Sequence, residues 1–223
     1  KSFVKMTDLD FDLVYKVHAT GSYSVTKAAW NVMREQGFGR VIMTTSAAGL
    51  YGNYGQANYS AAKLGIAGLA NTLALEGKSK NILVNTIAPV AGTRMTATVM
   101  PENLVAALKT EYVAPLVMYL CHESSSVNGG IFEVGAGWVS SVGWQRTKGT
   151  LISSMSPESV RDSWNKINDF SVFSNPSSTN DSITAVIQAA EEEKQQPKEE
   201  GNEHVKPSVV LGYKFKPLKF TYS

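Results

Sequence analysis

The sequence lacks the features that define several classes of protein. Cys121 is the only cysteine among 223 residues, which excludes an internal disulfide and fits a reducing compartment. No apolar run reaches the length of about 18 residues that marks a membrane-spanning helix. The first ten residues show no basic start followed by an apolar stretch, so we expect no signal peptide or other targeting signal here. His122 and His204 have no companions at ligand spacing, and we expect no metal site.

An excess of charge of one sign is missing too. Lys and Arg number 21 against 19 Asp and Glu, and the basic residues are scattered along the chain. A nucleic-acid-binding surface usually shows as a basic patch or stripe, so we expect no nucleic-acid partner. What the sequence does have is 43% hydrophobic residues, which is enough to bury a globular core.

Apolar periodicity and turn residues predict alternating helices and strands over the first 150 residues. We expect helices at 8–33, 58–77 and 102–120, and buried strands at 40–46, 81–89 and 130–135. The glycines at 135 and 137 predict a turn that carries Trp138. This alternation favours an α/β fold with a doubly wound, Rossmann-like parallel sheet. Three strands are few for such a sheet, so we expect its C-terminal half.

The two long helices differ in composition. The first begins after Thr7, an N-cap residue followed by acidic residues in the first turn. Its apolar face is expected to comprise Leu13, Val14, Val17, Tyr23 and Val25. The helix at 58–77 is rich in alanine and glycine, which suits close packing against another helix or a sheet. That partner is either within the chain or a second copy of it, and the pattern leaves both open.

Beyond residue 150 the periodicity weakens. Ser156 and Pro157 predict a helix start that leads to Ile167, and a short helix is expected at 182–190. The charged stretch 191–204 cannot bury itself and is typical of a linker. We therefore expect three segments: a main domain at 1–170, a loop with a short helix and charged linker at 171–206, and the start of a second domain at 207–223.

The strongest chemical signal combines Ser46, at the end of a predicted strand, with Tyr59 and Lys63 at the start of a helix. Residues i and i+4 share one helix face, so the ammonium lies beside the phenol. At about 4 Å and an effective dielectric of about 20, this charge stabilises the ionised phenol by roughly 4 kcal/mol. Such a tyrosine can exchange a proton with a carbinol oxygen while a serine hydroxyl holds the same oxygen. A hydride-transfer enzyme needs this chemistry from its protein, because the cofactor supplies the hydride.

A YxxxK pattern alone is a common accident on a helix surface. Here Ser46 precedes Tyr59 by thirteen positions at a strand end, and the next predicted strand ends in Pro89. With these residues the chain resembles the short-chain dehydrogenase/reductase family. Within that family, residues 1 to about 170 resemble the 3-hydroxyacyl-CoA dehydrogenase unit of peroxisomal multifunctional enzymes. Five stretches carry this resemblance: TTSAAGLYGNYGQANYSAAKLG, NTIAPVAGTRMT, VMPE, EYVAPLVMYLCHES and GGIFEVGAGW.

The resemblance implies a role for each of these residues. Tyr59 would donate and accept the proton, and Ser46 would bind and orient the substrate oxygen. Lys63 would promote ionisation of Tyr59 and bind the nicotinamide ribose. The loop after the Pro89 strand would close over nicotinamide and pyrophosphate, with four residues nearest the cofactor: Ala91, Gly92, Thr93 and Arg94. Considered by itself, Arg94 favours a solvated surface charge, and only its place in this loop makes a ligand role an equal alternative.

The chain also departs from the family pattern. The helix before the serine strand usually carries an asparagine that holds a proton-relay water, and His18 stands at that place. A histidine there either supports the same water as part of the catalytic group or is a satisfied core residue. Val90 follows Pro89 where glycine is usual, and the glycine is delayed to Gly92. The glycine-rich phosphate loop and the acidic residue for the adenine ribose are absent, so the residues do not separate NAD from NADP.

The resemblance implies NAD-dependent oxidation of a (3R)-3-hydroxyacyl-CoA to the 3-ketoacyl-CoA in peroxisomal fatty-acid β-oxidation. It also implies NAD as cofactor, acyl-CoA as substrate, a homodimer, and a hydratase-like domain that starts near residue 207. One alternative is another short-chain reductase, such as a 3-oxoacyl-carrier-protein reductase that uses NADPH. An alternative from another class is a non-catalytic chain, because these 223 residues lack the phosphate-binding half. In isolation we expect them to be inactive.

Overall fold

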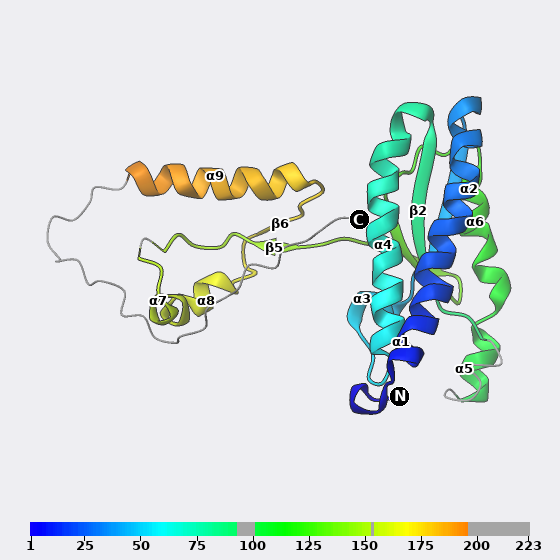
Figure 1. Ribbon diagram of the computed structural model, residues 1–223, viewed down its shortest axis with the longest axis horizontal. Coiled ribbons are helices and arrows are strands. Elements are labelled where there is room, and N and C mark those ends of the chain that lie inside the picture. Colours follow the sequence, from blue (N-terminus) through cyan, green and yellow to red (C-terminus); the bar gives the residue numbers. More distant parts are fainter. Residues whose placement is uncertain (93–100, 153, 196–223) are drawn as a thin grey trace, which may run out of the picture. The chain divides into compact units, whose positions relative to one another are not determined.

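The computed structural model describes residues 1–92, 101–152 and 154–195 of the chain. The chain divides into two compact units, Lys1–Gly143 and Trp144–Ser223 (Figure 1). This division falls before residue 170, where the sequence predicts the end of the main domain, and that domain organisation stays a prediction. The predicted segment 207–223 lies outside the described residues. Within the described ranges, no helix is both long and apolar enough to cross a membrane.

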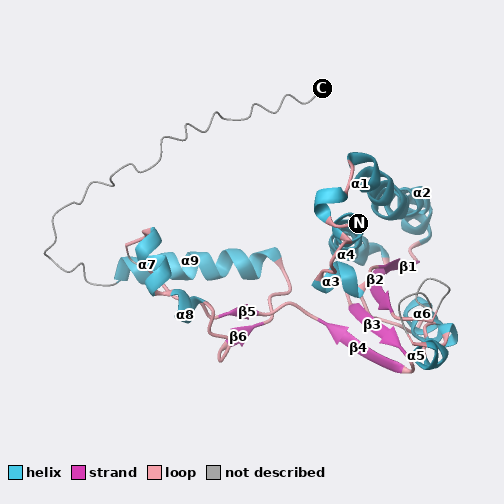
Figure 2. Cartoon of the chain, turned by 90° about the horizontal axis from the view of Figure 1, so that it is seen from below, coloured by secondary structure: helices cyan, strands magenta, loops and turns pink. Residues whose placement is uncertain are grey.

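The first unit is built on a four-stranded sheet with the order β1-β2-β3-β4 (Figure 2). Its strands are β1 (Gly39–Thr44), β2 (Ile82–Pro89), β3 (Ile131–Gly135) and β4 (Trp138–Val142). β1, β2 and β3 are parallel, which confirms the predicted α/β fold class. The expectation of only a turn near Trp138 is wrong, because the turn leads into β4, which is antiparallel to β3. Ala136 and Gly137, at φ of 51° and 81°, form the two-residue turn that favours a hairpin.

Helices cover both faces of this sheet. They are α1 (Asp8–Tyr15), α2 (Gly21–Gln36), α3 (Ala47–Tyr51), α4 (Ala57–Gly77), α5 (Glu102–Ala107) and α6 (Ala114–Cys121). α2 and α4 lie on one face of the sheet and α6 on the other (Figure 2). The single helix expected at 102–120 is wrong, because a 3₁₀ turn at Thr110–Tyr112 separates α5 from α6. Pro115 lies in the first turn of α6, where its missing N–H costs no helical hydrogen bond.

The core of the first unit lies between the sheet and α4. The buried residues that form it are Met33, Met43, Ile66, Ala70, Ala74, Ile82 and Val84. The small residues of α4 allow a close approach, as predicted, since a Cβ on Gly77 would lie 2.6 Å from the Ile82 main-chain oxygen. Packing of α4 against β1 and β2 therefore fixes the helix that carries Tyr59 and Lys63.

The first predicted helix is continuous but not uniform, because a π-helical turn at Lys16–Thr20 joins α1 to α2. The Thr7 side chain accepts from the Asp10 N–H and Asp10 accepts from the Thr7 N–H, which confirms the predicted N-cap. A left-handed Gly37 with φ of 67° ends α2, as glycine commonly ends helices.

The apolar face expected on this helix is largely exposed in the described part of the chain. Val17 and Val25 are 61% and 74% exposed, whereas His18, Ser22 and Thr26 are half-buried. The Ser22 and Thr26 hydroxyls each donate to the main-chain oxygen four residues earlier, at 2.8 Å in both cases. Since these hydrogen bonds are made within the helix, the polar side chains turn inward without losing partners.

The second unit contains short elements and one longer helix. Its elements are β5 (Arg146–Thr147), α7 (Pro157–Asp162), α8 (Trp164–Ile167), β6 (Phe173–Ser174) and α9 (Thr179–Gln195). Ser156 caps α7 in a reciprocal pair with Ser159, which confirms the predicted helix start. The loop expected at 171–182 contains β6, which pairs with β5. The predicted helix at 182–190 is longer and includes residues 191–195 of the predicted linker, where glutamate, lysine and glutamine are good helix formers.

Candidate active site

Ser46 lies where β1 ends and α3 begins. Its backbone is extended, with φ of −159° and ψ of 154°, and its side chain caps α3 by accepting from the Ala48 N–H at 3.2 Å. Serine is a preferred N-cap residue because its oxygen satisfies one of the free N–H groups of the first turn. This hydrogen bond uses the oxygen as an acceptor, so the hydroxyl proton remains available to a substrate oxygen.

Tyr59 and Lys63 occupy the first two turns of α4. The spacing of four residues places the Lys63 Nζ 5.6 Å from the centre of the Tyr59 ring. The Tyr59 ring is half-buried, whereas Lys63 is 8% exposed. The predicted neighbourhood of a phenol and an ammonium is therefore present.

Lys63 is held by its surroundings as well as by its helix. Its Nζ donates to the Thr44 main-chain oxygen at 2.9 Å, at the end of β1. Burial lowers the pKa of the Lys63 ammonium from its ordinary value. An ammonium has three N–H groups, and this hydrogen bond uses one of them.

His18 also lies against the Tyr59 ring. Its ring meets the Tyr59 ring edge-on, with 5.1 Å between centres and 85° between planes. The π-helical turn at Lys16–Thr20 carries this histidine, and such turns occur frequently at functional sites. Burial, and then the charge of Lys63, lower the pKa of His18 below its ordinary value. The imidazole is therefore neutral at neutral pH and can either donate or accept a hydrogen bond.

Two of the four predicted cofactor-loop residues are described. Ala91 and Gly92 follow the carboxyl end of β2, and Thr93 and Arg94 lie outside the described residues. The Gly92 N–H donates to the Leu108 main-chain oxygen at 2.5 Å. Because β1 and β2 are parallel, Ala91 and Gly92 emerge at the same edge of the sheet as Ser46. Ligands of open α/β sheets bind at this edge.

Taken together, these side chains can hold and move one proton. The Tyr59 phenol contacts a neutral imidazole and lies one helical turn from a buried ammonium, and Ser46 caps the neighbouring helix α3. The structure brings His18, Tyr59 and Lys63 together, although they are separated by up to 45 positions in the sequence. An alcohol or carbonyl oxygen is the substrate group that such an arrangement serves.

Three contacts at the site have no counterpart in the sequence pattern. The Thr45 hydroxyl donates to the Lys63 main-chain oxygen at 2.6 Å. A Cβ on Gly49 would lie 2.8 Å from the Lys63 Cβ, so only glycine lets α3 approach α4 this closely. At the end of α3, Tyr51 donates to Glu133 of β3 at 2.8 Å. The one signal that could have identified Gly49 is its place in a short helix, where glycine is unfavourable without such a reason.

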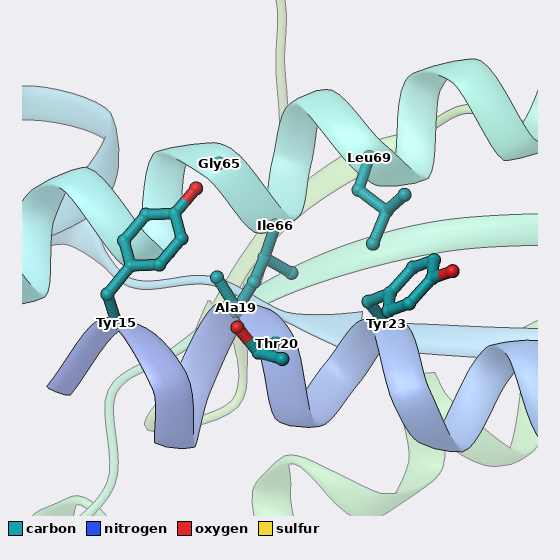
Figure 3. A pocket seen from close by; sticks show the side chains of 7 residues that line it. All are labelled: Tyr15, Ala19, Thr20, Tyr23, Gly65, Ile66 and Leu69. Carbon is teal, nitrogen blue, oxygen red and sulfur yellow. The ribbon is translucent and has the colours of Figure 1, made fainter. Parts of the chain in front are cut away.

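A separate hollow lies between the α1–α2 segment and α4. It measures about 250 Å³ and is lined by Tyr15, Ala19, Thr20, Tyr23, Gly65, Ile66 and Leu69 (Figure 3). The Tyr15 hydroxyl points toward Gly65, and Leu69 and Tyr23 lie farther along the two helices (Figure 3). None of these lining residues is a member of the phenol, ammonium and imidazole group, so this hollow is not the site of the chemistry.

Comparison with known proteins identifies similar chains. Residues 1–104 match the sequence profile described as short chain dehydrogenase. The chain is 56% identical over 192 residues to peroxisomal multifunctional enzyme type 2 of Mus musculus, and this alignment covers 84% of the chain. It is 54% identical over 188 residues to peroxisomal multifunctional enzyme A of Dictyostelium discoideum, again over 84% of this chain.

A solved structure shows the same similarity. Full-length peroxisomal multifunctional enzyme type 2 of Drosophila melanogaster superposes with a TM-score of 0.79 at 40% identity, over 86% of this chain. The matched regions make up 26% of the mouse protein, 43% of the Dictyostelium protein and 36% of the Drosophila chain. The chain thus spans less than half the length of each of these relatives.

Proposed function

Because the chain belongs to the short-chain dehydrogenase family, we propose that it carries out the proton transfer of a (3R)-3-hydroxyacyl-CoA dehydrogenase. The observation that carries this proposal is the grouping of Tyr59 with the buried Lys63 ammonium and the neutral His18 ring. The relatives that support the substrate class are named peroxisomal multifunctional enzymes and a peroxisomal hydratase-dehydrogenase-epimerase. Peroxisomal fatty-acid β-oxidation is the corresponding proposed setting.

In the proposed reaction, Tyr59 takes the proton of the substrate 3-hydroxyl group. The Lys63 ammonium, on the same face of α4, supplies a positive charge near the ring whose oxygen accepts this proton. Ser46 donates its hydroxyl proton in a hydrogen bond to the same substrate oxygen and so fixes its orientation. His18, with a neutral ring against the phenol, supports the onward path of the proton. Bound nicotinamide would supply the acceptor for the hydride that leaves carbon 3.

The residues present fit such a cofactor. Lys63 donates one N–H to Thr44, and the remaining N–H groups of an ammonium suit the hydroxyl groups of a nicotinamide ribose. Ala91 and Gly92 begin a loop at the edge of the sheet where ligands of α/β folds bind. We propose NAD as the cofactor, with Thr93 and Arg94 as further residues toward its pyrophosphate. The choice of NAD over NADP follows from the resemblance of the sequence to this family and not from particular residues of this chain.

The test is a substrate comparison in the full-length protein. NADH formation is measured by absorbance with (3R)- and (3S)-3-hydroxyacyl-CoA of several chain lengths, and the reverse reaction is measured with a 3-oxoacyl-carrier protein and NADPH. The proposal expects NAD-dependent oxidation of the (3R) substrate at least tenfold faster than of the (3S) substrate. Preference for the carrier protein and NADPH would support the reductase alternative instead.

A homodimer through the first unit is part of the proposal. Tyr23, Val25 and Val32 of α2 are each at least half exposed, and Leu64 and Leu75 of α4 are 41% and 73% exposed. The hollow between the two helices adds a concave apolar surface on which a second copy could pack (Figure 3). Sedimentation velocity of the full-length protein tests it, since a Val25→Glu change is expected to shift a dimer toward monomer.

A second candidate concerns the 223 residues by themselves. Dinucleotides gain most of their binding energy from a glycine-rich loop at a helix N-terminus and from an acid on the ribose, and the sequence contains neither motif. We propose that the isolated chain neither binds NAD nor oxidises substrate, although it contains Ser46, Tyr59 and Lys63. Titration calorimetry on the isolated chain is the measurement, and a dissociation constant below about 1 mM, roughly −4 kcal/mol of binding free energy, would contradict it.

A further inference from the structure

The end of β1 is joined to α4 by two hydrogen bonds of opposite direction. The Thr45 hydroxyl donates to the Lys63 main-chain oxygen at 2.6 Å, and the Lys63 Nζ donates to the Thr44 main-chain oxygen at 2.9 Å. The Thr45 N–H also donates to the Ile87 main-chain oxygen at 2.8 Å. Thr45 is 2% exposed, so water does not compete for its hydroxyl group. This residue therefore connects the strand end, the neighbouring strand and the helix.

Each end of this connection carries a residue of the candidate site. Ser46 follows Thr45 directly, and Lys63 is the residue whose main chain accepts the hydrogen bond. Tyr59 lies one turn before Lys63 on the same rigid helix. On the other side of Ser46, Gly49 packs α3 against Lys63 so closely that an added Cβ would approach the Leu64 nitrogen to 3.0 Å. The distance between Ser46 and Tyr59 thus depends on how the strand end is fastened to α4.

We propose that Thr45 is a positioning residue, whose hydroxyl holds the strand end that carries Ser46 in register with the helix that carries Tyr59 and Lys63. The inference rests on the proposed function, because that reaction requires Ser46 and Tyr59 to reach one substrate oxygen together. A displacement of about 1 Å in such a pair can cost about 10²-fold in rate. Thr45 does not touch the substrate in this assignment and acts through Ser46 and Lys63.

The test compares three variants in the full-length protein. Thr45→Val keeps the shape of the side chain and removes the donor, whereas Thr45→Ser keeps the donor and removes a methyl group. Thr86→Val is the matched control, since Thr86 is 1% exposed in β2 and takes the same change. If Thr45→Val does not fold, Thr45→Cys replaces it, because a thiol is a weak donor of similar size to a hydroxyl.

We expect Thr45→Val to lower kcat by about 10- to 100-fold while KM for NAD and for 3-hydroxyacyl-CoA changes less than about threefold. Thr45→Ser is expected to retain kcat within about threefold. Thr86→Val is expected to retain kcat too, even if its melting temperature falls by as much as that of Thr45→Val. These contrasts separate positioning from a general loss of stability, which would affect the two valine variants alike.

The outcomes separate the two proposals. Normal turnover by Thr45→Val in an otherwise active protein overturns the positioning role and leaves the proposed function intact. Equal losses of kcat in Thr45→Val and Thr86→Val also overturn it, since the effect would then follow stability. A wild-type protein that does not oxidise 3-hydroxyacyl-CoA overturns the proposed function, and the role of Thr45 in that reaction with it.

Discussion

The two units of the chain differ in how their structure is stabilised. In the first unit, Ile66, Ile82 and Val84 are at most 1% exposed, and the sheet packs against α4. In the second unit, none of the described side chains is fully buried, and Trp164 and Ile187 are 56% and 51% exposed. Hydrogen bonds in short elements predominate there, namely the capping box at Ser156 and the two-residue pairing of β5 with β6.

This difference explains where the candidate site lies. The candidate site combines residues from four segments, the π-helical turn, the end of β1, the start of α4 and the loop after β2. Segments that are distant in sequence keep a fixed geometry only when a packed core holds them together. The described residues of the second unit include no buried side chains and so form no comparable frame. A core is therefore a precondition of the site as well as a source of stability.

The largest expected effect tests whether the chemistry depends on the first unit. Tyr59→Phe in the full-length protein keeps the ring and removes the proton-transferring oxygen, so turnover should fall by about 10²- to 10⁴-fold. NAD binding should remain nearly intact, because the ring still packs against His18. Steady-state kinetics and cofactor fluorescence measure both. Tyr54→Phe is the control, since Tyr54 is 91% exposed, and near-normal turnover of Tyr59→Phe would remove this residue from the mechanism.

A pair of isoleucine variants sharpens the contrast in packing. Ile82→Ala, at a position that is 0% exposed, should lower the free energy of unfolding by about 2–5 kcal/mol. Ile187→Ala, at a position that is 51% exposed, should lower it by less than about 1 kcal/mol. Urea denaturation followed by circular dichroism gives both values. Equal losses would mean that the second unit has a core of its own, and the contrast between the units would fail.

Within the first unit, Lys63→Ala tests whether the site residues are electrostatically coupled. Turnover should fall about 10- to 100-fold, and NAD affinity should weaken with the loss of the proposed ribose contact. The pKa of His18 should rise, because the charge of Lys63 is one of the two causes that lower it. Nuclear magnetic resonance of the His18 ring protons follows its titration. Lys16→Ala, which removes an exposed lysine from the same turn as His18, is the matched control.

The smallest expected effects concern His18 itself. His18→Asn, which restores the residue usual in the family, should keep most of the activity, whereas His18→Ala should lose about tenfold or more. Equal and severe losses would instead indicate a specific role for the imidazole, provided that the melting temperatures are unchanged.

The pKa of His18 also predicts a pH dependence of stability. Because the folded state lowers this pKa, the unfolded state binds a proton more readily as the pH falls below about 6.5. The contribution of neutral His18 is therefore fully present at neutral pH and is lost as the pH falls toward the lowered pKa. Urea denaturation at pH 7.5 and 5.5 should show a smaller acid-induced loss of stability for His18→Asn than for the wild type. An identical loss would contradict the assignment.

Much of the fold could be predicted from the sequence because buried elements carry a simple pattern. The parallel strands β1, β2 and β3 are covered on their faces and appear as continuous apolar runs. β4 lies at the edge of the sheet with mostly exposed side chains, so its five residues carry no such signal. The half-buried face of α2 could not be predicted either, because it carries the polar residues Ser22 and Thr26. Their hydroxyl groups make hydrogen bonds within the helix.

Some features of the candidate site could likewise be predicted from the sequence and others could not. The proximity of Tyr59 and Lys63 could be predicted because residues four positions apart share one face of a helix. The role of Thr45 could not be predicted. A β-branched residue near a strand end gives the same sequence pattern whether or not its hydroxyl makes a hydrogen bond to a helix. The π-helical turn could not be predicted either, because it is a change in main-chain hydrogen bonding and side-chain periodicity does not show it.

The π-helical turn at Lys16–Thr20 makes the length of this segment as important as its composition. A π-helical turn accommodates one more residue than an α-helical turn, and each residue of an α-helix advances by about 100° around the axis. A single deletion within the turn would restore the phase of an ordinary helix and rotate α1 against α2 by about that angle. The imidazole of His18 would then leave the phenol of Tyr59, even though every residue of the candidate site would still be encoded.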